Sequence, residues 1–270
     1  MIWQRARAWA AGLLFVLGML FGTTGSASAA SSVSAEARAQ LVPTGKLRAA
    51  ILTYDPALGS RDASGAPGGV EGDLVRLLAD RVGVPLQPIF YDTPQGYARS
   101  VGTLAWDIAF AGRDIPGRVD YGPTILLVEH ALLLGPGKSF QDLADVDRDK
   151  VRIGVTAYTM EEQFLAQRLH KAFVFRVLVG TDAASETLRN SGADVFAASV
   201  PFLSKVAADV PGSRLIGPAY ALAPVVLAVA PGRTSALDYL ADFIREAKTT
   251  GFIQKSINRA KLPGVTVGPP

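Results

Sequence analysis

Short apolar runs alternate with segments of helical periodicity along most of the chain, and this alternation limits the possible folds more than any other feature. In the first half, strands are expected at residues 47–52, 86–91 and 107–110, with helices at 70–82 and 94–104 between them. The segment 70–82 carries its apolar residues three or four positions apart, as a helix with one buried face does. Strands that alternate with helices predict α/β units around mostly parallel sheets.

The same rhythm returns in the second half of the chain. Here the expected elements are strands at 151–155, 172–178, 194–198 and 225–230, and helices at 159–171, 182–189, 201–207, 237–248 and 253–261. Between the two sets lies an apolar segment, 124–134, which is long enough to leave one lobe and enter the next. We therefore expect an α/β protein of two similar lobes rather than one sheet.

The N-terminus has the three parts of a secretory signal peptide. Arg5 and Arg7 precede a 13-residue apolar run at 10–22, and small residues at Ala27 and Ala29 follow it. An uncleaved membrane anchor is the alternative, but a span takes about 20 apolar residues. We expect residues 1–29 to be removed and the mature protein to reach the periplasm.

Charge and composition exclude several function classes. Without Arg5 and Arg7, the 27 basic residues become 25, against 24 acidic residues, so the mature chain is close to neutral. A neutral chain lacks the broad positive surface that binds nucleic acid or anionic membranes. The chain has no cysteine and two histidines, which excludes disulfides and thiol catalysis and argues against a metal site. We expect no cofactor.

A series of short motifs, in order, covers nearly all of residues 44–262. They are GKLR at 45–48, GDL at 72–74, WDIAF at 106–110, VDYGPTILL at 119–127, VRIGVTAYTMEE at 151–162, GADVFAA at 192–198 and GFIQKSINRAKL at 251–262. In order and spacing, these motifs resemble the bacterial extracellular solute-binding proteins of family 3. Proteins of that family are the periplasmic receptors of amino-acid-type ABC importers.

The resemblance implies a type II periplasmic-binding-protein clamshell, in which two crossover strands join two α/β lobes. It places residues 30–127 and 225–270 in lobe 1 and residues 128–224 in lobe 2. It also implies a monomer that binds a small-molecule ligand between the lobes and docks on an ABC permease in the inner membrane. The general rule for open α/β sheets likewise puts ligands at the carboxyl ends of strands.

Two arginines in the loop after the third strand are candidates for an anion clamp. A guanidinium matches a carboxylate with two parallel hydrogen bonds. The resemblance gives this role to Arg118, although the loop is shorter than in typical members and Arg113 could take it instead. The alternative is that both are surface arginines paired with Asp114 or Asp120.

Tyr158 and Thr159 precede a predicted helix whose N-terminus favours an anion. Thr159 and Glu162 also form a capping-box sequence, which explains Thr159 without any ligand. The resemblance adds a ligand contact at this turn, with Tyr158 in place of the family's glycine. Both interpretations stay open.

Ser199 stands where amino-acid receptors of the family often carry an aspartate for the ligand ammonium, while Asp194 matches a structural aspartate. The ligand therefore need not be a standard α-amino acid. Tyr54 and Asp55 follow the first strand, where the family's side-chain pocket begins, and Tyr54 could instead cover a loop. Leu52 replaces an acid found in some receptors for basic amino acids.

Phe110 is expected to line either the core or the cleft. Glu129 and His130 interrupt the apolar crossover segment, and such a pair could act as general acid and base. Neighbouring residues on a strand point to opposite faces, so we favour a structural role for the pair. Glu129 is still a candidate contact for a ligand amine.

These observations favour a periplasmic substrate-binding protein of an ABC importer, without enzymatic activity. It would bind a small polar, carboxylate-bearing, amino-acid-like solute and close by a hinge motion. Two alternatives stay open. One is an exported dehydratase-like enzyme on the same fold, with Glu129 as its acid, and the other is a sensor that presents ligand to a membrane receptor.

Overall fold

The computed structural model describes residues 32–112 and 118–269. Residues Val33–Pro270 form one compact unit. The expected signal peptide and Arg113 lie outside the described residues. In the part of the chain that is described, no helix has the length and apolar character needed to cross a membrane.

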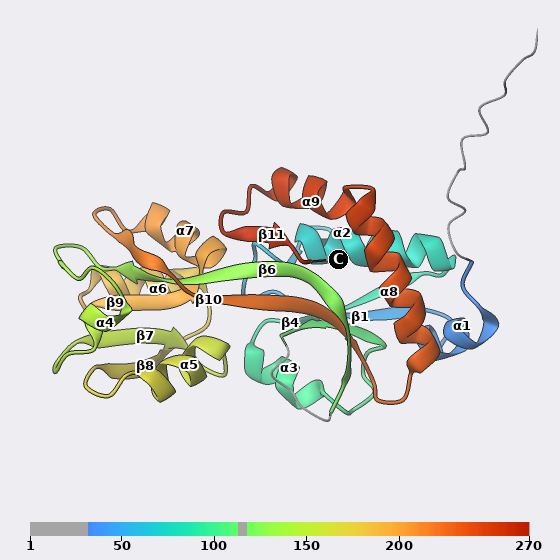
Figure 1. Cartoon of the computed structure of the whole chain (residues 1–270), viewed down its shortest axis with the longest axis horizontal. Helices are drawn as coiled ribbons and strands as arrows, with labels where there is room; N and C mark the ends of the chain where they lie inside the picture. Colours follow the sequence, from blue (N-terminus) through green and yellow to red (C-terminus); the bar gives the residue numbers. More distant parts are fainter. Residues whose placement is uncertain (1–31, 113–117, 270) are drawn as a thin grey trace, which may run out of the picture. The chain divides into compact units, whose positions relative to one another are not determined.

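Most of the described strands join one mixed sheet, in the order β4-β1-β5-β10-β6-β9-β7-β8, with β11 paired to β6 (Figure 1). The strands are β1 (Leu47–Leu52), β4 (Leu86–Tyr91), β5 (Ile108–Ala111), β6 (Asp120–Leu134), β7 (Arg152–Thr156), β8 (Phe173–Val177), β9 (Val195–Ser199), β10 (Arg214–Val229) and β11 (Val265–Val267). A separate pair is formed by β2 (Ser60–Arg61) and β3 (Pro67–Gly68).

The sheet contains the two expected α/β sets. In the first strand set, β1 lies parallel to both β4 and β5. In the second strand set, β7 lies parallel to both β8 and β9. The expectation of two separate sheets is wrong. The long strands β6 (15 residues) and β10 (16 residues) pair antiparallel with each other, and β10 also pairs with β5 and β6 with β9, which joins the sets into one sheet.

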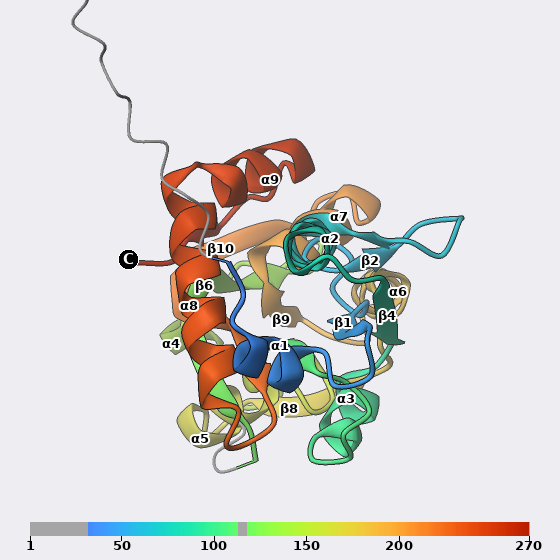
Figure 2. The same cartoon turned by 90° about the vertical axis from the view of Figure 1, so that its right-hand side faces the viewer.

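Helices cover the faces of both strand sets. They are α1 (Ala35–Leu41), α2 (Gly69–Val82), α3 (Pro94–Ser100), α4 (Leu143–Val146), α5 (Met160–Arg168), α6 (Thr181–Arg189), α7 (Val200–Asp209), α8 (Thr234–Thr249) and α9 (Phe252–Ala260). Figure 2 shows α1 beside α8, where Gln40 accepts a hydrogen bond from the Ala236 N–H (3.1 Å).

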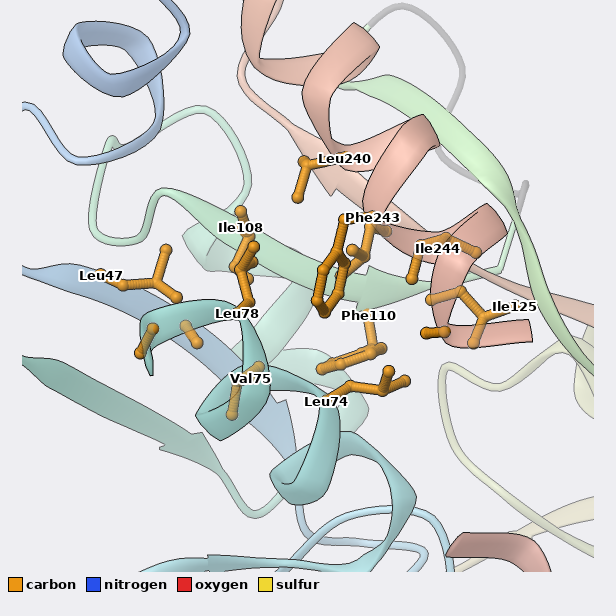
Figure 3. Packing of buried hydrophobic residues seen from close by; sticks show 14 of the residues in the cluster. Leu47, Leu74, Val75, Leu78, Ile108, Phe110, Ile125, Leu240, Phe243 and Ile244 are labelled. Atoms are coloured by element: carbon orange, nitrogen blue, oxygen red, sulfur yellow. The ribbon is translucent and has the colours of Figure 1, made fainter. Parts of the chain in front are cut away.

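The strand sets have their own hydrophobic cores. Around the first set, Leu74 and Leu78 of α2 meet Phe243 of α8 and Phe110 of β5 (Figure 3). The spacing of Leu74 and Leu78 puts both on one helix face, as the sequence pattern predicts. Around the second set, Phe196 of β9 is fully buried in a separate cluster drawn from residues 131–210.

An aspartate stands just before a strand in each set and ties two strands together. Asp107 accepts hydrogen bonds from the Arg48 backbone N–H (3.1 Å), Nε (3.0 Å) and Nη2 (2.7 Å). Asp194 accepts from the Arg152 N–H (2.8 Å) and pairs with Lys138 Nζ (2.6 Å). The structural role expected for Asp194 thus has a counterpart in the first set.

Candidate functional site: a cavity at the strand ends

A cavity of about 630 Å³ opens at the carboxyl ends of strands from both sets. The last residues of four strands line it: Leu52 of β1, Ala111 of β5, Thr156 of β7 and Ser199 of β9. Parallel strands end at a common edge, so loops and helix N-termini gather there. Parts of β6 and β10 complete the wall.

Asp55 is a buried carboxyl group in this wall. It is 5% exposed, and its Oδ1 accepts a hydrogen bond from the Ala57 N–H (3.2 Å). Its Oδ2 accepts from the Ser199 hydroxyl at 2.6 Å, which links two segments 144 positions apart. Burial raises the pKa of Asp55, and the hydrogen bonds from Ser199 and Ala57 oppose this rise only in part.

Ser199 has two roles at the end of β9. Its hydroxyl oxygen accepts a hydrogen bond from the Phe202 N–H (3.2 Å) and so caps α7. The same hydroxyl group donates a hydrogen bond to Asp55. The β6–β9 register places it opposite His130. Ser199, which stands where the resembling family often has an aspartate, therefore contacts an acid from the loop after β1.

His130 and Glu161 form a second buried pair in the wall. His130 Nδ1 lies 2.7 Å from Glu161 Oε1, and both residues are less than a tenth exposed. Burial raises the pKa of Glu161, but its charge interaction and hydrogen bond with His130 outweigh burial and leave the pKa below its usual value. Glu161 is therefore an ionised carboxylate at neutral pH, with His130 as its hydrogen-bond partner.

The N-terminus of α5 differs from the predicted capping box. Thr159 is at the N-cap position, but its side chain makes no capping bond, and its hydroxyl donates to the Thr156 carbonyl (2.8 Å). Glu162 reaches one residue further back and accepts the Tyr158 N–H (2.8 Å). Tyr158 has φ +63°, a conformation that suits the glycine of the resembling family.

Arg118 also lines the cavity, and it is an exposed residue. One of its guanidinium nitrogens, Nη2, donates to the Val101 carbonyl at 2.8 Å. This bond ties Arg118 to the end of α3. The remaining guanidinium donors are not used by any hydrogen bond within the described residues.

Glu71 lies close to the site without lining it. This residue of α2 is 4% exposed, and its Oε2 has no hydrogen-bond partner among the described residues. Burial raises the pKa of Glu71 to about 8, the Leu52 backbone hydrogen bond lowers it, and the charge of Asp55 raises it further. Glu71 is thus protonated at neutral pH.

The cavity brings together most of the residues singled out in the sequence. Those that line it are Tyr54, Asp55, Arg118, Tyr158, Thr159 and Ser199. Phe110 does not line it, because its side chain points into the core beneath α2 (Figure 3). Glu129 is exposed and is not among the lining residues.

The pairing of His130 with Glu161 was not predicted from the sequence. In the sequence, His130 stands beside Glu129 as a possible acid–base pair, but strand alternation turns these two side chains to opposite faces. Glu161 was visible as an acid in the first turn of the predicted helix at 159–171. Nothing in the sequence indicated that β6 would run past that helix.

Apolar side chains from several elements surround these polar groups. They include Leu52, Leu58, Tyr97, Met160, Phe202 and Leu222. Over residues 32–112 and 118–269, no group of three or more His, Asp or Glu side chains could hold a metal ion. The site is therefore an apolar cavity with a few convergent polar groups, which is typical of sites for small organic ligands.

Sequence comparison finds no protein-family model and no curated protein that matches the chain. Comparison of structures does find similar proteins. An ancestral amino-acid-binding protein, a precursor of cyclohexadienyl dehydratase, has a TM-score of 0.72 at 20% identity over 82% of this chain and 98% of its own. This chain has the two-lobed fold of periplasmic binding proteins.

Two further structures have the same fold. A solute receptor for L-cysteine of Neisseria gonorrhoeae gives a TM-score of 0.71 at 18% identity, over 84% of this chain and 94% of its own. A substrate-binding protein of an amino-acid ABC transporter gives 0.68 at 17% identity, over 80% and 98%. The expected clamshell fold is confirmed, since these matches span nearly the whole of the other chains.

Proposed function

We propose that the protein is the periplasmic solute-binding component of an ABC importer. The observation that carries this proposal is the cavity at the ends of β1, β5, β7 and β9, because it draws its walls from both strand sets. Structures with the same fold are receptors for amino acids, which adds support. Export would follow cleavage of the signal peptide near Ala29.

Ligand binding would close the two lobes over the cavity. The proposed lobes comprise residues 30–127 with 225–270, and residues 128–224. They are joined by β6 and β10, which would flex where they pass from one strand set to the other. A closed, liganded monomer would then dock on the membrane permease.

The ligand is proposed to be a small polar solute with a carboxylate. Arg118 has guanidinium donors left for an anion at the rim of the cavity. The N-terminus of α5, beside Tyr158 and Thr159, offers backbone N–H groups and a positive dipole end. Tyr54 would contact the body of the ligand.

A thermal-shift screen of residues 30–270 tests this proposal. Amino acids, small carboxylates and amines are added singly at millimolar concentration, and the melting temperature is followed. A true ligand binds only the folded state, so at about 100 times its Kd it adds about 2.7 kcal/mol of stability. If no small solute raises the melting temperature, the protein is not a solute receptor.

An exported enzyme on the same fold is the second candidate. It is favoured by two buried carboxyl groups of one cavity, Asp55 and Glu161, whose pKa values are shifted in opposite directions. Such a pair can serve as acid and base. Incubation with small carboxylates, including prephenate-like compounds, should leave them unchanged if the protein only binds, and turnover lost in Glu161→Gln would establish the enzyme.

A further inference from the structure

Asp55 is a buried carboxyl group of the cavity wall that has no cationic partner among the described residues. Its contacts are the Ser199 hydroxyl and the Ala57 N–H, and no ion pair of Asp55 occurs among the described residues. The charge of Lys205 on α7 lowers the pKa of Asp55, but Lys205 is an exposed residue and forms no ion pair with Asp55 among the described residues. A buried carboxylate without a partner is costly, so its place in a cavity wall calls for a reason.

The other charges of the wall do not compensate Asp55. His130 contacts Glu161 at 2.7 Å, and within the described residues it makes no hydrogen bond or ion pair with Asp55. Arg118 is exposed and bonded to the Val101 carbonyl. The charge of Glu161 raises the pKa of Asp55 and so does not compensate it, while Glu71 is protonated and neutral. Among the described residues, an ionised Asp55 therefore has no positive charge in contact with it.

The hydrogen bonds of Asp55 hold the carboxyl group in place and still leave it able to bind. A carboxylate offers about four lone-pair positions, and Asp55 uses one on each oxygen. Because Ser199 and Ala57 both donate, the remaining positions can only be filled by further donors. A ligand ammonium supplies donors and the missing charge together.

We propose that Asp55 binds the protonated amine of the ligand, at the wall formed by the loop after β1 and the end of β9. The proposal rests on the proposed solute-binding function and narrows its substrate class to amines, with the apolar lining contacting the ligand body. The acid comes from the loop after the first strand instead of from position 199. An amine alone is then sufficient for binding, whereas a carboxylate alone is not.

Matched ligand sets test the proposal. Each set contains an amino acid, the amine without its carboxylate, and the acid without its amino group. We would use leucine, phenylalanine and serine with 3-methylbutylamine, 2-phenylethylamine and 2-aminoethanol, and with 4-methylpentanoate, 3-phenylpropanoate and 3-hydroxypropanoate. In at least one set, the amine and the amino acid should bind, and the acid should bind at least tenfold more weakly.

Asp55→Asn should weaken binding of those amines by about tenfold to a hundredfold, the range for a hydrogen bond to a charged group. The control is Glu71→Gln, which removes a neighbouring buried carboxyl group that does not line the cavity, and which should keep amine affinity within about threefold. Circular dichroism melts verify that each variant folds. If the Asp55→Asn variant does not fold, Asp55→Glu is measured instead. This variant keeps the charge and should retain the preference for amines over acids.

The outcomes separate this inference from the function on which it rests. If solutes bind but acids without an amine bind as well as amines, or if Asp55→Asn keeps full amine affinity, the inference is wrong and the receptor function stands. If neither these sets nor the wider screen yields a ligand, both are wrong.

Discussion

At the scale of single residues, Glu71 makes the sharpest prediction about pH. Its pKa of about 8 in the folded protein lies above its ordinary value of 4.5. Between these values the folded state binds more protons than the unfolded state, so the free energy of unfolding falls as pH rises, by up to about 1.4 kcal/mol per pH unit. Glu71→Gln removes this contribution, and urea melts at pH 5, 6.5 and 8 should show a flatter pH dependence.

The matched control for Glu71 is the exposed Glu186 of α6. Glu186→Gln should leave the pH dependence of unfolding as in the original protein. As the pH rises from 5 to 8, the free energy of unfolding of Glu71→Gln should increase relative to that of Glu186→Gln by about 2–4 kcal/mol. Equal slopes for the two variants would mean that Glu71 is ionised in the folded protein.

Single residues of the site were predictable where they adjoin a recognisable strand end. Tyr54, Asp55 and Ser199 follow strands that are apolar and short, so their places at the edge of the sheet could be inferred. The partners of these residues could not. The bond between Asp55 and Ser199 joins segments 144 positions apart, and depends on how the strand sets meet.

At the scale of elements, the aspartates before β5 and β9 predict different losses of stability. The Asp107 side chain is fully buried with Arg48 and Arg233, whereas Asp194 is 17% exposed and its partner Lys138 is 37% exposed. Breaking a buried pair leaves an unpaired charge and costs about 3–5 kcal/mol, while exposed pairs contribute about 0–1 kcal/mol. Asp107→Ala should therefore destabilise more than Asp194→Ala.

Urea unfolding of both variants measures this difference. Asp242→Ala is a suitable reference, because it removes an exposed i,i+3 pair with Arg245 and should change the free energy of unfolding by less than about 1 kcal/mol. A loss for Asp107→Ala no larger than that of the reference would contradict a stabilising role for the buried pair.

Elements were predicted well where one face or both faces are clearly apolar. The strands at 47–52 and 86–91 have the expected bounds, because turn-forming residues delimit them. The strand at 225–230 is instead the end of β10, which begins at Arg214. Gly217 and Pro218 lie in a register shift between Ile216 and Ala221, where β10 departs from regular pairing with β6.

At the scale of the whole molecule, the continuity of the sheet was the feature that the sequence concealed. The hydrophobic periodicity of the sequence indicates the local structure of β6 and β10. It does not indicate that each of these strands passes from one strand set to the other. The β6 strand contributes Ile125 to the first core and Leu133 to the second. The two halves therefore share strands while keeping separate cores, an arrangement that permits the proposed closure.

Substitution of Gly264 tests how the C-terminal segment constrains the crossover between the two strand sets. Gly264 has φ +67°, and its carbonyl accepts the Glu129 N–H (2.8 Å) where β6 passes between the sets. An added Cβ would lie 2.8 Å from Val200 Cβ at the start of α7. Gly264→Ala should combine the cost of a left-handed residue, about 1–2 kcal/mol, with an overpacking cost of about 1–3 kcal/mol.

Gly232→Ala is the control that separates these two costs, because Gly232 has φ +83° but open space around its Cβ position. Urea unfolding should show the larger loss for Gly264→Ala by about 1–3 kcal/mol. Because Val200 follows Ser199 of the cavity, Gly264→Ala should also weaken ligand binding, whereas Gly232→Ala should not. Equal stabilities of the two variants would show that β11 moves aside freely and does not constrain the crossover between the strand sets.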